Sequence, residues 1–137
     1  MTQPKRLTPN EIAKEKSLYL RGTIAEELAK DTTHFGKDDN ILLKSHGTYE
    51  QDDRDLRQKL LAEKKEPLYG MMARLRTTGG KLSSEQYLQF DEIADKFGNH
   101  TLRATTRQTF QFYSIKKINM KQEFEMLQEE MDNILAI

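Results

Sequence analysis

The sequence predicts an α+β fold in two parts: a charged, largely helical segment followed by a unit of strands and helices. Two observations support this prediction. Residues 1–66 show little regular alternation of apolar and polar side chains, whereas residues 67–137 alternate strand patterns with helix patterns. We therefore expect 1–66 to be an extension, helical and irregular, that packs around a core, and 67–137 to be a small folded unit.

Composition limits the classes of protein to which this chain can belong. Its 137 residues suffice for one domain at most, with 36% hydrophobic and 32% charged residues. A net charge of zero argues against a general nucleic-acid binder, whose basic excess is usually visible in the totals. The chain has no cysteine, and its three histidines lack metal-ligand spacing, so no metal site is expected. Neither a secretory leader nor a membrane span is recognisable, which predicts a cytoplasmic protein without a membrane partner.

The amino-terminal segment carries helix signals near its start and near its end. Thr8 with Glu11 fits a capping box at the start of a helix. The letters ILLK at 41–44 are expected to form a short apolar strand. The charged stretch after them predicts a helix, which must stop before Pro67 because the residue before a proline disfavours helical geometry.

The second part begins with a strand and a helix. The stretch YGMMARLRTT at 69–78 is typical of a strand, and a pair of glycines ends it. Ser83 with Gln86 fits a second capping box at the start of a helix, and Gly98 suits the cap at the end of that helix. Apolar residues recur along this helix at helical spacing: Tyr87, Phe90, Ile93, Ala94 and Phe97.

A second strand and a last helix complete the pattern. Residues 101–113, which begin TLRATTRQTFQF, predict the strand, and a helix is expected after Asn119. The apolar stripe expected on that helix is Phe124, Leu127, Met131, Ile134 and Leu135. A strand–helix–strand unit places its two strands parallel, with the helices on one face. Two strands make a poor domain, so we expect the unit to need another half or a partner.

One face of the second strand is entirely polar. Because side chains alternate along a strand, the even positions can pack against helices and the odd positions form this face. The odd positions are Arg103, Thr105, Arg107, Thr109, Gln111 and Tyr113. Arg74 and Arg76 share one face of the first strand, so four arginines are expected to converge on the open side of the sheet. Guanidinium forks pair with carboxylates and oxyanions, and such an array suits a broad, multiply charged anion. The alternative is a solvated polar face whose arginines pair with nearby acids.

Four motifs, in order, give the sequence a family resemblance: LRGTIAEEL, HGTYEQDDRDLR, RLRTTGG and TTRQTFQF. From about Leu18 to Asn119 the chain resembles the siroheme-dependent sulfite and nitrite reductases. It looks most like the amino-terminal part of the hemoprotein (beta) subunit of assimilatory sulfite reductase. The resemblance implies a ferredoxin-like half-domain (β-α-β-α) over 67–137, incomplete relative to the family, whose members pair two such halves.

The resemblance also implies an oxidoreductase, which reduces sulfite to sulfide with six electrons in sulfur assimilation and cysteine biosynthesis. The implied cofactors are siroheme and a 4Fe–4S cluster, the implied substrate is sulfite or nitrite, and the implied electron donor is a flavoprotein subunit or ferredoxin. By the same resemblance, Arg74 belongs to the catalytic anion cage. Arg103, Thr105, Arg107 and Gln111 would contact siroheme.

The chain also departs from the family pattern. It is far shorter than family members and lacks the cysteines that ligate the cluster. Tyr113 and Ser114 stand where the family usually has histidine and glycine, and Ser45 stands where an aromatic residue is common. We therefore expect that this chain alone does not reduce sulfite and that it works with the remainder of the hemoprotein. The alternatives are a non-catalytic remnant and a small module that binds anions or nucleic acid.

Overall fold

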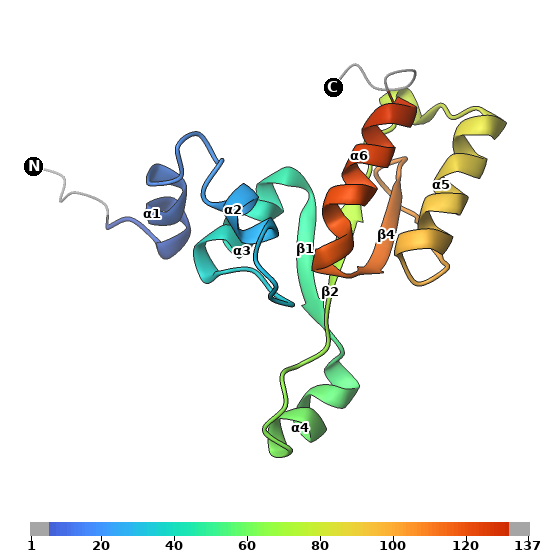
Figure 1. Cartoon of the computed structure of the whole chain (residues 1–137). Coiled ribbons are helices and arrows are strands. Elements are labelled where there is room, and N and C mark those ends of the chain that lie inside the picture. The colour runs from blue at the N-terminus through green and yellow to red at the C-terminus, as the bar shows by residue number, and fades with distance from the viewer. Residues whose placement is uncertain (1–5, 132–137) are drawn as a thin grey trace, which may run out of the picture.

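The computed structural model describes residues 6–131, which form a four-stranded sheet with surrounding helices (Figure 1). The strands are β1 (Thr48–Asp52), β2 (Tyr69–Arg74), β3 (Leu102–Ala104) and β4 (Phe110–Ile115). The α-helices are α1 (Pro9–Glu15), α2 (Ile24–Leu28), α3 (Lys37–Leu43), α4 (Arg54–Ala62), α5 (Ser84–Phe97) and α6 (Met120–Met131). Short 3-10 turns are η1 (Lys44–His46), η2 (Thr78–Gly80) and η3 (Lys117–Asn119). Figure 1 shows α5 and α6 together at the sheet, α1 to α3 grouped near β1, and α4 projecting from the ends of β1 and β2.

The strand order is β1-β2-β4-β3, and every neighbouring pair is antiparallel. The expectation of two neighbouring parallel strands is therefore wrong. The reason lies in residues 101–113, which form a hairpin rather than one strand. The backbone N–H of Thr105 donates to the Thr109 carbonyl at 2.8 Å, and Gln108 takes φ 59° in the turn. The hairpin reverses the chain, so β4 enters the sheet between β2 and β3.

The amino-terminal segment contributes a strand to this sheet, although not where the sequence indicates one. The prediction that ILLK forms a strand is wrong. Residues 37–43 form α3, and the buried side chains of Leu42 and Leu43 lie on that helix. The strand of this segment is β1, which pairs antiparallel with β2 along its whole length. The expected charged helix is present as α4 and ends before Pro67.

Both capping boxes predicted from the sequence are present. Thr8 and Glu11 exchange the expected hydrogen bonds at α1, and Ser83 and Gln86 do so at α5. The N–H of Gly98 closes α5 by donating to the Ala94 carbonyl at 3.0 Å.

The core lies between the sheet and the two long helices. Phe90 of α5 meets Phe110 and Phe112 of β4, with ring centroids 6.2 and 6.4 Å apart. The apolar face of β4 therefore faces the helices, as its alternation predicts. Further buried members of this core include Met71, Ala73, Ile93, Ala94, Ile115 and Leu127. The opposite face of the sheet is left for polar side chains.

Helix α6 buries a different stripe from the expected one. Up to Gln128, where its side chains are described, the buried ones are those of Met120, Glu123 and Leu127, whereas Phe124 is 38% exposed. The predicted burial of Leu127 is thus confirmed. The predicted burial of Phe124 is wrong, because the packing of α6 turns the neighbouring Glu123 inward instead. The side chain of Met131, and Ile134 and Leu135, lie outside the described residues.

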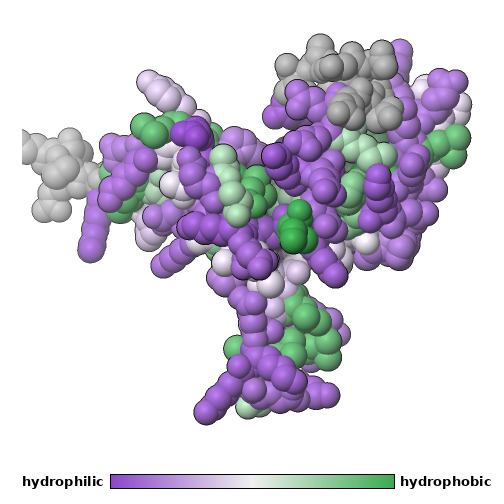
Figure 2. Space-filling model, viewed as in Figure 1, coloured by the Kyte–Doolittle hydropathy of each residue, from purple (hydrophilic) through white to green (hydrophobic). Residues whose placement is uncertain are grey.

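Helix α4 forms a projecting arm that buries none of its side chains. Leu56 and Leu61 on this helix are 40% and 54% exposed, and Figure 2 shows apolar surface on the arm among hydrophilic residues. Across residues 6–131, no helix combines the length and the apolar character that crossing a bilayer requires.

A bulge in β4 stores backbone strain. The pairing with β2 shifts register here, so Tyr113 and Ser114 together oppose Met72. Ser114 takes φ 59°, a left-handed conformation that glycine adopts without steric cost.

Ser114→Gly is expected to raise the free energy of unfolding by about 0.5–1 kcal/mol, because relief of the left-handed strain exceeds the added entropy of the unfolded chain. Urea unfolding measures the change. Ser84→Gly is the matched control, since Ser84 is exposed at the start of α5 and is not at positive φ. That control is expected to lose stability, and a similar loss for Ser114→Gly would contradict the strain argument.

Candidate functional site

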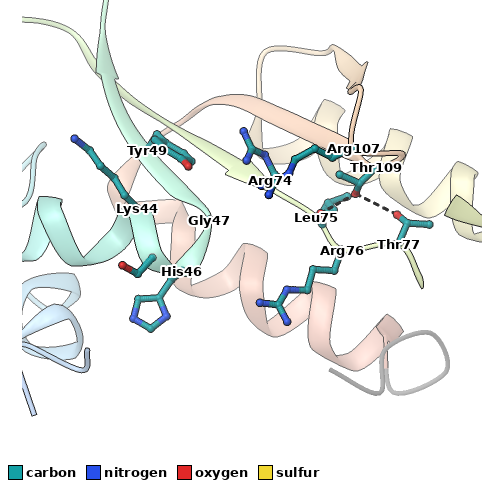
Figure 3. A pocket seen from close by; sticks show the side chains of 11 residues that line it. Lys44, His46, Gly47, Tyr49, Arg74, Leu75, Arg76, Thr77, Arg107 and Thr109 are labelled. Atoms are coloured by element: carbon teal, nitrogen blue, oxygen red, sulfur yellow. Dashed lines mark hydrogen bonds between the residues drawn. The ribbon is translucent and has the colours of Figure 1, made fainter. Parts of the chain in front are cut away.

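A depression of about 500 Å³ opens where β1, β2 and the β3–β4 hairpin meet (Figure 3). Three segments line it. The turn before β1 and β1 itself supply Lys44, Ser45, His46, Gly47 and Tyr49; the end of β2 and the residues after it supply Arg74, Leu75, Arg76 and Thr77; the hairpin supplies Arg107 and Thr109.

Backbone and hydroxyl hydrogen bonds fix these segments to one another. The N–H of Arg74 donates to the Gly47 carbonyl at 2.9 Å, which joins the first wall to the second. The Oγ1 of Thr109 donates to the Leu75 carbonyl at 2.7 Å and lies 3.2 Å from the Oγ1 of Thr77 (Figure 3). Since Thr109 is only 6% exposed, these bonds hold the hairpin against the end of β2 from inside the protein.

The depression is strongly cationic. Four permanent cations line it, Lys44, Arg74, Arg76 and Arg107, and no described carboxylate does. The ion pairs within residues 6–131 involve other side chains. Cations gathered without counter-ions repel one another, and a bound anion removes that cost. The arrangement therefore favours an anionic ligand over the alternative of arginines that pair with nearby acids.

His46 also lines the depression but is partly engaged. Its Nε2 lies 2.9 Å from the Leu20 carbonyl oxygen, so the ring donates this proton to the backbone. The bond ties the turn before β1 to the segment between α1 and α2.

The open face of the sheet continues the cationic surface beyond the depression. Gln111 of β4 pairs with Arg74 of β2 on one side and with Arg103 of β3 on the other, so the three side chains form a row across the sheet. Arg74 lies over the ring of Tyr49 at 5.5 Å, and Arg103 lies over the ring of Tyr113 at 4.7 Å. Both guanidinium groups are thus held against aromatic rings.

The structure separates the predicted site residues into two groups. Arg74 and Arg107 line the depression, together with Arg76, while Arg103 and Gln111 belong to the row beside it. Thr105 lies in the hairpin turn, where its Oγ1 accepts from the Arg107 backbone N–H at 3.3 Å. The prediction that Arg103 and Arg107 share one straight strand face is wrong, because the turn lies between them.

The lining residues that sequence reasoning missed include Lys44, Tyr49 and Thr77. Lys44 directly precedes the Ser45-His46-Gly47 motif, and this proximity is a signal that could have included it. Thr77 directly follows Arg76 in the RLRTTGG motif, which could have included it, whereas the pairing of β1 with β2 is what brings Tyr49 to the arginines.

The chain matches known proteins over nearly its whole length. The family model described as the nitrite/sulfite reductase ferredoxin-like half domain matches residues 63–130. The sulfite reductase (NADPH) hemoprotein beta-component of Staphylococcus haemolyticus is 45% identical over 133 residues, which are 96% of this chain and 23% of that protein. The protein of the same description from Shouchella clausii is 48% identical over 125 residues, or 90% of this chain and 22% of the relative.

The relatives are much longer than this chain, which spans less than a quarter of their length. The match fits the amino-terminal portion of the hemoprotein subunit. The α+β architecture and the matched half domain agree with the fold class that the sequence predicts. The chain therefore belongs to the nitrite/sulfite reductase family, and residues 63–130 are its ferredoxin-like half domain.

Proposed function

We propose that this chain is the amino-terminal portion of a sulfite reductase hemoprotein subunit and supplies one wall of its siroheme and anion pocket. The observation that carries the proposal is the acid-free cationic depression beside the Arg74–Gln111–Arg103 row. Siroheme is a tetrapyrrole with eight carboxylates, and planar guanidinium groups bind carboxylates through paired hydrogen bonds. The residues present therefore fit such a group.

The proposed roles follow from position. Arg74, at the centre of the cationic surface, binds the substrate anion, sulfite or nitrite, and stabilises negative charge during its reduction. Arg107 in the depression and Arg103 on the adjacent face bind carboxylates of siroheme. Thr105 shapes the hairpin turn that carries Arg107, and Gln111 orients Arg74. Siroheme, when bound, supplies the iron at which the anion is reduced.

The 4Fe–4S cluster of the family does not fit this chain, because the sequence contains no cysteine to ligate it. We place the cluster ligands and the other walls of the pocket in the remainder of the hemoprotein. The electron donor is then a flavoprotein subunit or ferredoxin, the compartment is the cytoplasm, and the isolated chain has no reductase activity.

Arg107→Ala is expected to weaken binding of a tetrapyrrole octa-acid by about tenfold, because a charge-assisted hydrogen bond to a carboxylate is lost. The full chain is titrated with uroporphyrin, and porphyrin absorbance and fluorescence report binding. Arg54→Ala removes an exposed arginine from the distant α4 arm and is the matched control.

Equal effects of the Arg107 and Arg54 substitutions would contradict the site and indicate general charge attraction. A preference for a single-stranded oligonucleotide over uroporphyrin at matched salt would instead favour the nucleic-acid-binding alternative.

A further inference from the structure

We propose that Tyr113 is a positioning residue, which holds Arg103 directly and Arg74 through Gln111. The inference rests on the proposed anion-binding role of this face of the sheet. It goes further by assigning to Tyr113 the orientation of two cations that lie on different strands.

The bulge in β4 directs Tyr113 to the open face. Phe112 and Ile115 are 1% and 0% exposed and both belong to the core, although three positions separate them and strict alternation would place them on opposite faces. The extra residue of the bulge, with Ser114 at φ 59°, resolves this conflict. Tyr113, next to the inward Phe112, therefore lies among the polar side chains of the other face.

The ring of Tyr113 supports Arg103. The guanidinium carbon of Arg103 lies 4.7 Å from the ring centroid, within the range of a cation–π contact. Arg103 is exposed on the edge strand β3, where a long side chain would otherwise sample many rotamers. The half-buried ring restricts that freedom before any anion binds.

The hydroxyl of Tyr113 fixes the Gln111 side chain. Gln111 is only 7% exposed, and its amide lies 2.8 Å from the Tyr113 Oη. In the orientation that satisfies both neighbours, the amide nitrogen donates to Oη. The amide oxygen then accepts from Nε and Nη2 of Arg74, at 2.8 and 2.9 Å. Arg74 can only donate and therefore selects this orientation, and the Tyr113 hydroxyl accepts from the amide nitrogen and fixes the amide in place.

The two cations are held at a defined spacing. Arg74 and Arg103 pair with the same residue, Gln111, from opposite sides, so their backbones lie roughly 10 Å apart, two strand spacings. With Nε and one Nη2 proton engaged by Gln111, the remaining N–H groups of Arg74 stay available to a ligand. Preorganised cations lose less side-chain entropy when the anion binds.

Tyr113→Phe tests the hydroxyl. Without Oη the Gln111 amide is held only through its oxygen and leaves this orientation more often, so solvent exchange of the Arg74 Nε proton, followed by ¹⁵N NMR on the full chain, is expected to accelerate. Affinity for uroporphyrin is expected to fall about threefold to tenfold, the loss expected for one buried hydrogen bond. Tyr113→Ala also removes the ring under Arg103 and is expected to cost about threefold more.

Tyr19→Phe is the matched control, since Tyr19 is fully exposed and its hydroxyl removal should change neither measurement. In an Arg74→Ala background, Tyr113→Phe is expected to have no further effect on uroporphyrin affinity, because its action passes through Arg74. Unchanged Arg74 exchange in Tyr113→Phe, or an undiminished effect in the Arg74→Ala background, would overturn the proposal. Since NMR exchange needs no ligand, a chain that fails to bind uroporphyrin would contradict the proposed function while the role of Tyr113 is still tested.

Discussion

Glu123→Leu is expected to raise the free energy of unfolding at pH 8 by about 2–4 kcal/mol, because it replaces a buried polar group that has no partner with an apolar one. Glu123 lies on the face of α6 that is turned toward the core and is 0% exposed. Neither of its carboxylate oxygens has a hydrogen-bond partner among the described residues. Burial alone raises the pKa of this carboxyl from 4.5 to about 8. Leucine matches the apolar neighbours Met120 and Leu127 on the same stripe.

The same carboxyl makes stability depend on pH in a defined direction. Between pH 4.5 and about 8, the folded chain keeps the Glu123 proton and the unfolded chain has lost it. Folding then takes up a proton, so stability falls as pH rises, by about 1.4 kcal/mol per pH unit across this window. The contribution of the protonated group is fully present below pH 4.5 and is lost as pH rises through 8.

Urea unfolding at several values between pH 5 and pH 9 measures this slope. Glu123→Gln is expected to abolish it, since the amide does not titrate, and Glu125→Gln on the exposed face of α6 is expected to preserve it. Hydrogen bonds lower the pKa values of the other shifted carboxyls, so those groups titrate below the window: Glu11, Glu27, Asp52 and Glu66. A wild-type slope retained by Glu123→Gln would show that another group is responsible.

Lys117→Ala is expected to lower the free energy of unfolding by about 2–3 kcal/mol, through the lost packing of a buried side chain and the lost hydrogen bond of its ammonium group. The Lys117 side chain is 1% exposed, and its Nζ donates to the Oγ1 of Thr32. The same Nζ lies 5.0 Å from the ring centroid of Phe35 and 4.0 Å from an oxygen of Glu27. These contacts attach the segment around α2 and α3 to the turn that precedes α6.

Chemical denaturation measures the loss, and hydrogen exchange locates it. Amides of α2 and α3 are expected to exchange faster in Lys117→Ala, because their attachment to the half domain is weakened. Lys116→Ala changes the exposed neighbour and is expected to stay within about 0.5 kcal/mol of the wild type. If both variants lose equal stability, the buried contacts of Lys117 are not the cause.

Features determined within a few residues were predictable from the sequence. The capping boxes at Thr8 and Ser83 depend on side chains three positions apart, and the structure has both. The cationic site was also visible, because Arg74, Arg76 and Arg107 lie in short motifs without nearby acids. Four ordered motifs indicate the family from the sequence alone.

Features that depend on contacts between distant segments were decided by the tertiary structure alone. The bulge at Ser114 that turns Tyr113 outward depends on the pairing of β4 with β2. The pairing of β1 with β2 brings Lys44 and Tyr49 beside the arginines.

The inward position of Glu123 shows the same division. Hydrophobicity along the helix favours Phe124 as the buried residue, but the surface that the sheet and α5 offer to α6 turns Glu123 inward. Sequence by itself determined the helix caps, the cationic motifs and the family. Strand pairing and helix packing, which join residues far apart in the chain, decided which of those side chains meet.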